Sequence, residues 1–160
     1  MLEQLILYFV CKTKGHITKT QLVKFLYLAD LYSVKWTEKQ LTELNWCYYN
    51  HGPWNKDIDN ALESMGEVIK LQESGNAILV TLADESLVAV DFELSEGLKL
   101  MLENIRKEWA GSGPEKFQEL MEYVYSTAPM VDAKSKYKPQ DQAQLNLRLE
   151  RERLLEELGV

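Results

Sequence analysis

Residues 18–32 constrain the fold of this chain more than any other segment. Thr18 and Gln21 have the spacing of a capping box, which satisfies free backbone N–H groups at the start of a helix. Ile17 and Leu22 have the spacing of a hydrophobic staple, so a helix is expected to begin at Thr18. Its apolar stripe consists of Leu22, Phe25, Leu26, Ala29 and Tyr32, widened by Leu28 and Leu31. A helix that is apolar over so much of its circumference is expected at the centre of the fold.

Weaker patterns predict the remaining elements. Helices are expected at 2–10, 55–65, 95–109 and 114–125. Strands are expected at 67–72, 77–82 and 87–94, with turn-forming residues between them. They would form a small antiparallel meander, to which an aromatic strand at 45–50 could add a fourth member. The sequence therefore predicts an α+β fold that is mainly α, with a helical core, a small antiparallel β-meander and a C-terminal helix.

The C-terminal part of the chain divides into a polar stretch and a segment of strong helical propensity. Residues 131–142 are expected to form a loop, and residues 143–160 a helix. Two apolar stripes compete on that helix: Leu147, Leu154 and Leu158, or Leu145, Leu149 and Leu155. Three placements stay open: docking on its own domain, pairing with a second copy in a homodimer, or free movement. Residues 1–132 are expected to form one domain, and residues 133–160 a linker and an amphipathic helix.

The charge balance bears on the partners of the protein. The chain has 160 residues and a formal net charge of −7, with a sequence pI of about 4.9. An acidic surface repels phosphate, which disfavours wholesale binding to nucleic acid or to an anionic membrane. No apolar run approaches the roughly 20 residues that a membrane-spanning helix needs. Two cysteines without a CxxC spacing fit reduced thiols, so a cytoplasmic protein is expected.

No catalytic constellation stands out in the sequence. The two histidines, His16 and His51, lie outside any GxSxG or HExxH frame, and there is no phosphate-binding GxxxxGK[ST] loop. The acidic side chains are scattered over polar helix faces and do not stand out as a pair. The chain is therefore expected not to be an enzyme and to need no cofactor.

A zinc site is one alternative. Cys11 and His16, joined to Cys47 and His51, would supply four ligands for tetrahedral zinc. Both pairs are short of the usual finger spacings. A lone thiol at the end of an amphipathic helix, or among strand aromatics, more often serves packing. We therefore expect no metal.

A winged-helix transcriptional regulator is another alternative, because helices followed by a small meander are its ingredients. A recognition helix presents lysine and arginine to DNA phosphates. The helix expected at 55–65 instead carries Lys56, Asp57, Asp59 and Glu63. The helix at 18–32 offers two lysines but is largely apolar. Binding to nucleic acid is therefore disfavoured.

The stretch "YYNHGPWNKDI", residues 48–58, gathers aromatic rings directly before a helix. Its Gly52-Pro53 step is expected to end the aromatic strand and turn the chain. Two interpretations stay open: the rings pack the sheet onto the helices, or they form a contact surface, since Trp and Tyr make the deepest interface anchors. We call Tyr48, Tyr49, His51, Gly52, Pro53 and Trp54 the aromatic corner. The expected partner-binding residues are this corner together with Trp36.

Four short motifs occur in order along the chain. They are "LVKFLYLADLY" at 22–32, the Leu41-Thr42 step, the aromatic strand Trp46–Tyr49 with the Gly52-Pro53 step after it, and "YVYSTAPM" at 123–130. With these motifs the chain resembles the Panacea domain family, also called SocA-like or phage-associated GepA-like. The resemblance covers about residues 1–132, and the tail lies outside it.

This resemblance implies a mainly helical fold with a small sheet, and a bacterial or phage-borne antitoxin. Members of the family bind a partner toxin directly, and at least one branch is a proteolytic adaptor that delivers its toxin to a AAA+ protease. The expected function is therefore that of an antitoxin with a toxin as partner. A phage-associated transcriptional regulator is the alternative.

Overall fold

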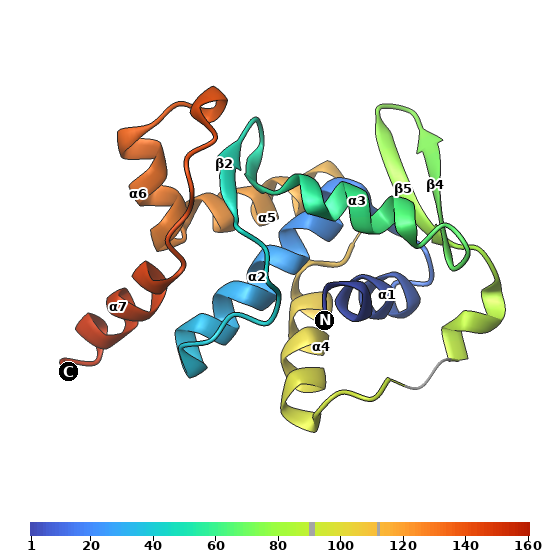
Figure 1. Cartoon of the computed structure of the whole chain (residues 1–160), viewed down its shortest axis with the longest axis horizontal. Coiled ribbons are helices and arrows are strands. Elements are labelled where there is room, and N and C mark those ends of the chain that lie inside the picture. Colours follow the sequence, from blue (N-terminus) through green and yellow to red (C-terminus); the bar gives the residue numbers. More distant parts are fainter. Residues whose placement is uncertain (90–91, 112) are drawn as a thin grey trace.

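Helix α2 (Lys19–Thr37) lies at the centre of the fold, as the sequence predicts (Figure 1). Both halves of its capping box form: Thr18 Oγ1 accepts from the Gln21 backbone N–H at 3.1 Å, and Gln21 Oε1 accepts from the Thr18 N–H at 3.0 Å. Every residue from Gln21 to Leu31 is buried. The helices that contact it are α1 (Leu2–Lys12), α4 (Glu96–Trp109), α5 (Pro114–Ser126) and α7 (Arg148–Glu157). Its apolar circumference is thus covered on several sides.

The computed structural model describes residues 1–89, 92–111 and 113–160. The remaining helices are α3 (Lys56–Ser64) and α6 (Ala128–Lys136), with 3-10 turns at Glu85–Ala89 and Pro139–Asp141. The strands are β1 (Ile17–Thr18), β2 (Cys47–Tyr49), β3 (Gly52–Trp54), β4 (Ile69–Ser74) and β5 (Ala77–Leu82). The predicted class, α+β and mainly α, is confirmed. None of the helices formed by these residues is long and apolar enough to cross a membrane.

A three-stranded antiparallel sheet has the order β1–β5–β4. Strands β4 and β5 form the hairpin that the sequence predicts, with Ile69 opposite Leu82 at its base. The third strand is β1, in which Ile17 pairs with Val80 of β5. A strand of two residues is too short for a pattern of alternation, so the sequence could not predict it.

Two predicted strand placements are wrong. Of residues 87–94, the first three belong to a 3-10 helix, the last three are irregular, and residues 90 and 91 lie outside the described residues. The Asp84 carboxylate accepts from the Ser86 backbone N–H at 2.9 Å, which starts a turn where a strand was expected. The aromatic strand does not join this sheet either, because β2 pairs with β3 in a separate hairpin.

The N-terminal half has the topology of a winged helix. Elements α1, β1, α2, α3, β4 and β5 follow one another in the order of that fold, and the sheet order β1–β5–β4 agrees with it. The β2–β3 hairpin is inserted between α2 and α3. Helix α3 thus takes the place of a recognition helix. Its exposed side chains include Lys56 but also Asp57 and Glu63, so the likeness extends to topology and not to charge.

A buried carboxylate fixes the irregular segment that follows α2. Asp30 is fully buried on α2, and its two oxygens accept four hydrogen bonds. The donors are the Leu41 N–H at 3.0 Å, the Thr42 N–H at 2.9 Å, the Thr42 hydroxyl, and the Trp46 indole N–H at 2.8 Å. Residues 41–46 are therefore held against α2 although they form no regular structure there.

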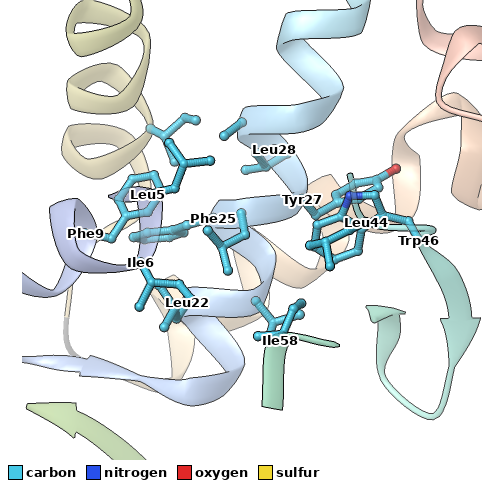
Figure 2. Close-up of a cluster of buried hydrophobic side chains, with 14 of the residues drawn as sticks. Leu5, Ile6, Phe9, Leu22, Phe25, Tyr27, Leu28, Leu44, Trp46 and Ile58 are labelled. Atoms are coloured by element: carbon cyan, nitrogen blue, oxygen red, sulfur yellow. The ribbon is translucent and has the colours of Figure 1, made fainter. Parts of the chain in front are cut away.

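The same anchor positions an aromatic ring pair that ties three parts of the chain together. Trp46 is 1% exposed and packs edge-on against Tyr27, with ring centroids 5.5 Å apart. Figure 2 shows these two rings beside Leu44 within the buried cluster. The Tyr27 hydroxyl lies 2.8 Å from Thr127 Oγ1, at the junction of α5 and α6. Residues from three of the four motifs named above, at 22–32, Trp46 and Thr127, thus meet in one place.

The C-terminal segment docks on its own domain, which was one of the three placements left open. The Tyr48 N–H donates to the Ala143 carbonyl, and the Leu145 N–H to the Trp46 carbonyl, both at 2.8 Å. Leu145 and Leu147 are buried. The loop predicted at 131–142 is wrong in its first half, because α6 extends to Lys136. Lys136 pairs with Asp132 one turn earlier at 2.9 Å, which supports that helix.

We expect replacement of Asp30 by alanine to lower the free energy of unfolding by roughly 3–5 kcal/mol, because the buried donors of Thr42 and Trp46 lose their acceptor. Urea denaturation followed by circular dichroism measures this change. Asp132→Ala is the matched control: it removes a surface ion pair and should cost less than about 1 kcal/mol. Equal losses in the two variants would contradict the anchoring role of Asp30.

Candidate partner-binding site

The β2–β3 hairpin carries the aromatic corner. Tyr49 lies opposite Gly52, and Asn50 and His51 make the turn between the strands. The Gly52-Pro53 step therefore lies inside β3, and the prediction that it ends the aromatic strand is wrong. Gly52 has a φ of 115°, a backbone conformation that L side chains rarely adopt, which explains why a glycine stands there.

Successive residues of a strand point to opposite faces, and this separates the two tyrosines. Tyr48 is 6% exposed and belongs to the core. Tyr49 is half-buried, and its ring lies 4.9 Å from that of Trp54, which is also half-buried. The packing interpretation therefore holds for Tyr48 and Trp46. Tyr49 and Trp54 keep part of their rings in solvent.

A pocket of about 230 Å³ lies between this hairpin and the first turns of α2. Five of the predicted partner-binding residues line it: Tyr49, His51, Gly52, Pro53 and Trp54. Lys19 and Lys24 line it from α2. Strand β3 and α2 are in contact, so the pocket has two walls that are fixed relative to each other.

Trp36 is not part of this pocket. It lies in the last turn of α2, is 64% exposed, and lines a different hollow with Leu100 and Trp109 of α4. Tyr48 is covered by the C-terminal segment through the hydrogen bond to Ala143. The structure thus brings together five of the seven predicted residues and separates the other two.

Lys24 is the functional candidate that the sequence analysis missed. Its side chain is buried, with 3% of the residue exposed, and a methyl group built on Gly52 would lie 3.4 Å from its Nζ. Within the described ranges no residue gives Lys24 a hydrogen bond or an ion pair. Burial lowers the pKa of this amine to about 8. One signal in the sequence was available: a lysine inside a helix that is apolar almost all round.

Lys19, at the rim of the pocket, has a partner of its own. Its ammonium pairs with the Asp59 carboxylate of α3, and both side chains are partly exposed. Such a pair contributes little to stability, but it largely balances the charge of Lys19. Lys24 is therefore the cation that faces the pocket without a counter-ion among the residues described.

The zinc alternative is wrong, because the structure does not gather its four residues. The Cys11 thiol is buried and donates to the Leu87 carbonyl at 3.3 Å, and Cys47 donates to the Asn45 carbonyl at 3.3 Å. His16 and His51 line different hollows. In the part of the chain that the structure describes, no three His, Cys, Asp or Glu side chains come together as metal ligands would.

Another hollow is an open cleft of about 1230 Å³ beside the outer face of the β1–β5–β4 sheet. Its charged side chains, Lys14, His16 and Glu85, are all exposed, so solvent screens them. The pocket between the β2–β3 hairpin and α2 is therefore the better candidate site, because it combines half-buried aromatic rings with a buried charge.

A comparison with protein-family models gives the same assignment as the resemblance of the motifs. Residues 22–129 match the family described as "Antitoxin SocA-like, Panacea domain", and this range includes Lys24, the β2–β3 hairpin and Thr127. The match covers more than half of the chain, so the protein belongs to this family. Neither the curated proteins nor the solved structures contain a significant match.

The buried amine of Lys24 makes stability depend on pH. Its pKa is about 8 in the folded protein and about 10.4 in an unfolded chain, so between these values the unfolded chain holds more protons and stability rises with pH. We expect wild type to gain roughly 2 kcal/mol relative to Lys24→Met between about pH 7 and pH 9.5. Urea denaturation at each pH measures this difference.

Comparing wild type with Lys24→Met at each pH cancels the contribution to stability of the groups that titrate in both proteins. Burial raises the pKa of Tyr8 to about 12, and its ionisation opposes stability in strong alkali in every variant alike. Lys19→Met is the matched control, since that side chain is partly exposed and paired with Asp59. The same pH dependence in wild type and Lys24→Met would show that Lys24 is not buried as described.

Proposed function

We propose that the protein is an antitoxin that neutralises a partner toxin by binding it directly and occluding it. The observation that carries the proposal is the aromatic pocket on a chain of this family: Tyr49 and Trp54 stand half exposed around a hollow of about 230 Å³. Partly exposed tyrosine and tryptophan beside a pocket are typical of the residues that dominate the binding energy of protein interfaces.

The rigidity of the surface supports this proposal. The β2–β3 hairpin is tied to α2 by the Asp30 anchor through Trp46, and the C-terminal segment covers Tyr48. A short two-residue turn joins its strands. A surface already held in one conformation loses little freedom on association, so more of the contact energy appears as affinity.

The negative net charge of the protein supports a basic toxin as its partner. The chain carries a formal net charge of −7, and α3, the helix after the hairpin, has Asp57 and Asp59 in its first turn. Complementary charge accelerates encounter and selects partners more than it adds affinity. The overall negative charge would steer a basic toxin toward the protein, and the aromatic rings of the pocket would make the close contacts.

Neutralisation by occlusion needs only the surface described here. Delivery of the toxin to a AAA+ protease, as in a proteolytic adaptor, would need a second surface for the protease. The half-life of the toxin separates the two modes, because occlusion leaves it unchanged and delivery shortens it. Homodimer formation through α7 is less favoured, because Leu145 and Leu147, just before that helix, are buried against their own domain.

A phage-associated transcriptional regulator is the second candidate, favoured by the winged-helix topology alone. The acidic residues on α3 oppose it, because a recognition helix must approach phosphates. A salt-dependent shift of promoter DNA at submicromolar protein would support this candidate over the antitoxin.

Trp54→Ala should abolish protection while the protein stays folded, because the variant loses an interface anchor that is only half-buried in the free protein. We expect toxin affinity to fall about 30-fold, which corresponds to about 2 kcal/mol. The neighbouring gene is expressed alone, with wild type and with each variant, and growth is measured. Titration of an inactivated toxin into the purified protein gives the affinity.

Trp36→Ala is the matched control, since it removes an exposed tryptophan far along α2 from the pocket. Protection that is lost with Trp36→Ala and kept with Trp54→Ala would move the contact surface to α4. A neighbouring gene that is harmless when expressed alone would contradict the antitoxin role.

A further inference from the structure

Lys24 poses a physical problem that the fold does not solve internally. A lysine is almost never fully buried unless its charge is paired. Lys24 is 3% exposed, and in the described part of the chain it has neither a carboxylate nor a carbonyl oxygen as partner. A methionine or leucine would fill the same place on α2 without that cost. The amine lines the pocket and is therefore available to pair with a negative group that enters it.

The ammonium faces the pocket beneath the hairpin. Lys24 lines that pocket, and Gly52, which has no side chain, leaves the space in front of its Nζ open. The pocket lies at the N-terminus of α2, a helix of 19 residues whose positive dipole end also favours an anion. The Asp59 carboxylate of α3 is paired with Lys19 at the rim of the pocket. A negative group that enters would meet positive potential inside an otherwise acidic protein.

The size of the pocket limits what can enter. Pockets for small-molecule ligands measure roughly 300–1,000 Å³, whereas this one measures about 230 Å³. It suits a single amino-acid side chain or a chain end. Part of its wall is apolar, from Val23, Pro53 and Trp54, and this part matches the methylene stem of such a group. Polar side chains, Thr20, Asn50 and His51, also line it. Phosphate is usually held by several charged donors at once, such as backbone N–H nests or arginine forks. Of the two lysines that line this pocket, Lys19 is paired with Asp59, so Lys24 is the one left to balance a single negative charge.

We propose that this pocket receives one carboxylate of the partner protein, with the Lys24 ammonium as its counter-ion. The proposal rests on the proposed function, since it names the chemistry by which the toxin engages the aromatic pocket. The carboxylate belongs to an Asp or Glu side chain or to the C-terminus of the toxin. Tyr49 and Trp54 exclude water around the pair, which strengthens the attraction between the two charges.

The first experiment needs no toxin. The full chain with ¹³C-labelled lysine is titrated with propionate, which has the stem and carboxylate of a glutamate side chain, and with N-acetylglycine, which resembles a chain end. We expect a saturable shift of the Lys24 Cε signal, which is assigned by its loss in Lys24→Met. The stronger of the two probes identifies the source of the carboxylate. No response to either, or a stronger response to inorganic phosphate, would overturn the proposal.

The second experiment uses the inactivated toxin. Lys24→Met should weaken its binding about 30-fold, whereas Lys19→Met, at the rim, should change it less than about 3-fold. Lys24→Gln keeps a polar side chain without the charge and should bind as weakly as Lys24→Met. Circular dichroism verifies that each variant is folded. The toxin residue is found by replacing its acidic residues one at a time: the correct one loses affinity with wild type and shows no further loss with Lys24→Met.

The outcomes separate the two proposals. If Trp54→Ala weakens toxin binding and Lys24→Met does not, the antitoxin surface is retained and the carboxylate pocket is overturned. If wild type binds no product of a neighbouring gene, the proposed function fails. The titration with propionate and N-acetylglycine then still decides whether Lys24 pairs with a carboxylate.

Discussion

The Asp30 carboxylate is the interaction on which the rest of the structure depends. It is buried on α2, and four donors from residues 41–46 surround its oxygens. Burial nevertheless raises the pKa of this carboxyl above its usual value. Its contribution to stability is therefore greatest in acid and falls as the pH rises through the unfolded and then the folded pKa. We interpret Asp30 as a group that fixes position at some cost in stability: it places Trp46, and Trp46 leads directly into β2.

The parts of the fold that local signals control could be predicted, and those that distant contacts control could not. Thr18 caps α2 as expected, and the helices expected from residues 55 and 95 begin at the caps Asn55 and Ser95, because a cap depends on residues within one turn. The hydrogen bond from Trp46 to Asp30 joins residues sixteen positions apart, and neither residue type indicates which residue it will contact. The two apolar stripes predicted on the C-terminal helix are wrong for a related reason. Both assume a helix from residue 143, whereas α7 begins at Arg148 and the segment before it is not helical.

The candidate site was predicted in outline, and the errors have identifiable causes. The many aromatic residues indicated where the hairpin lies. They could not indicate that Tyr48 is buried and Tyr49 only half-buried, because that difference follows from the alternation of side chains along a strand. Trp36 was included because it is near in sequence, although α2 carries it away from the hairpin. Lys24 was considered only as one of the two lysines that the helix at 18–32 offers to DNA. In the folded protein Gly52 of the hairpin lies beside its Nζ.

The inserted hairpin supports the proposal that this winged-helix topology serves a protein partner. A DNA-binding helix displays its cations on the surface, where many phosphates share them. In this chain the hairpin between α2 and α3 covers Lys24, while α3 shows Asp57 and Glu63 to solvent. A buried cation is accessible only to a group small enough to enter beside Tyr49 and Trp54. One polypeptide side chain can do so, whereas a duplex backbone cannot, and this steric difference favours a toxin over DNA as the partner.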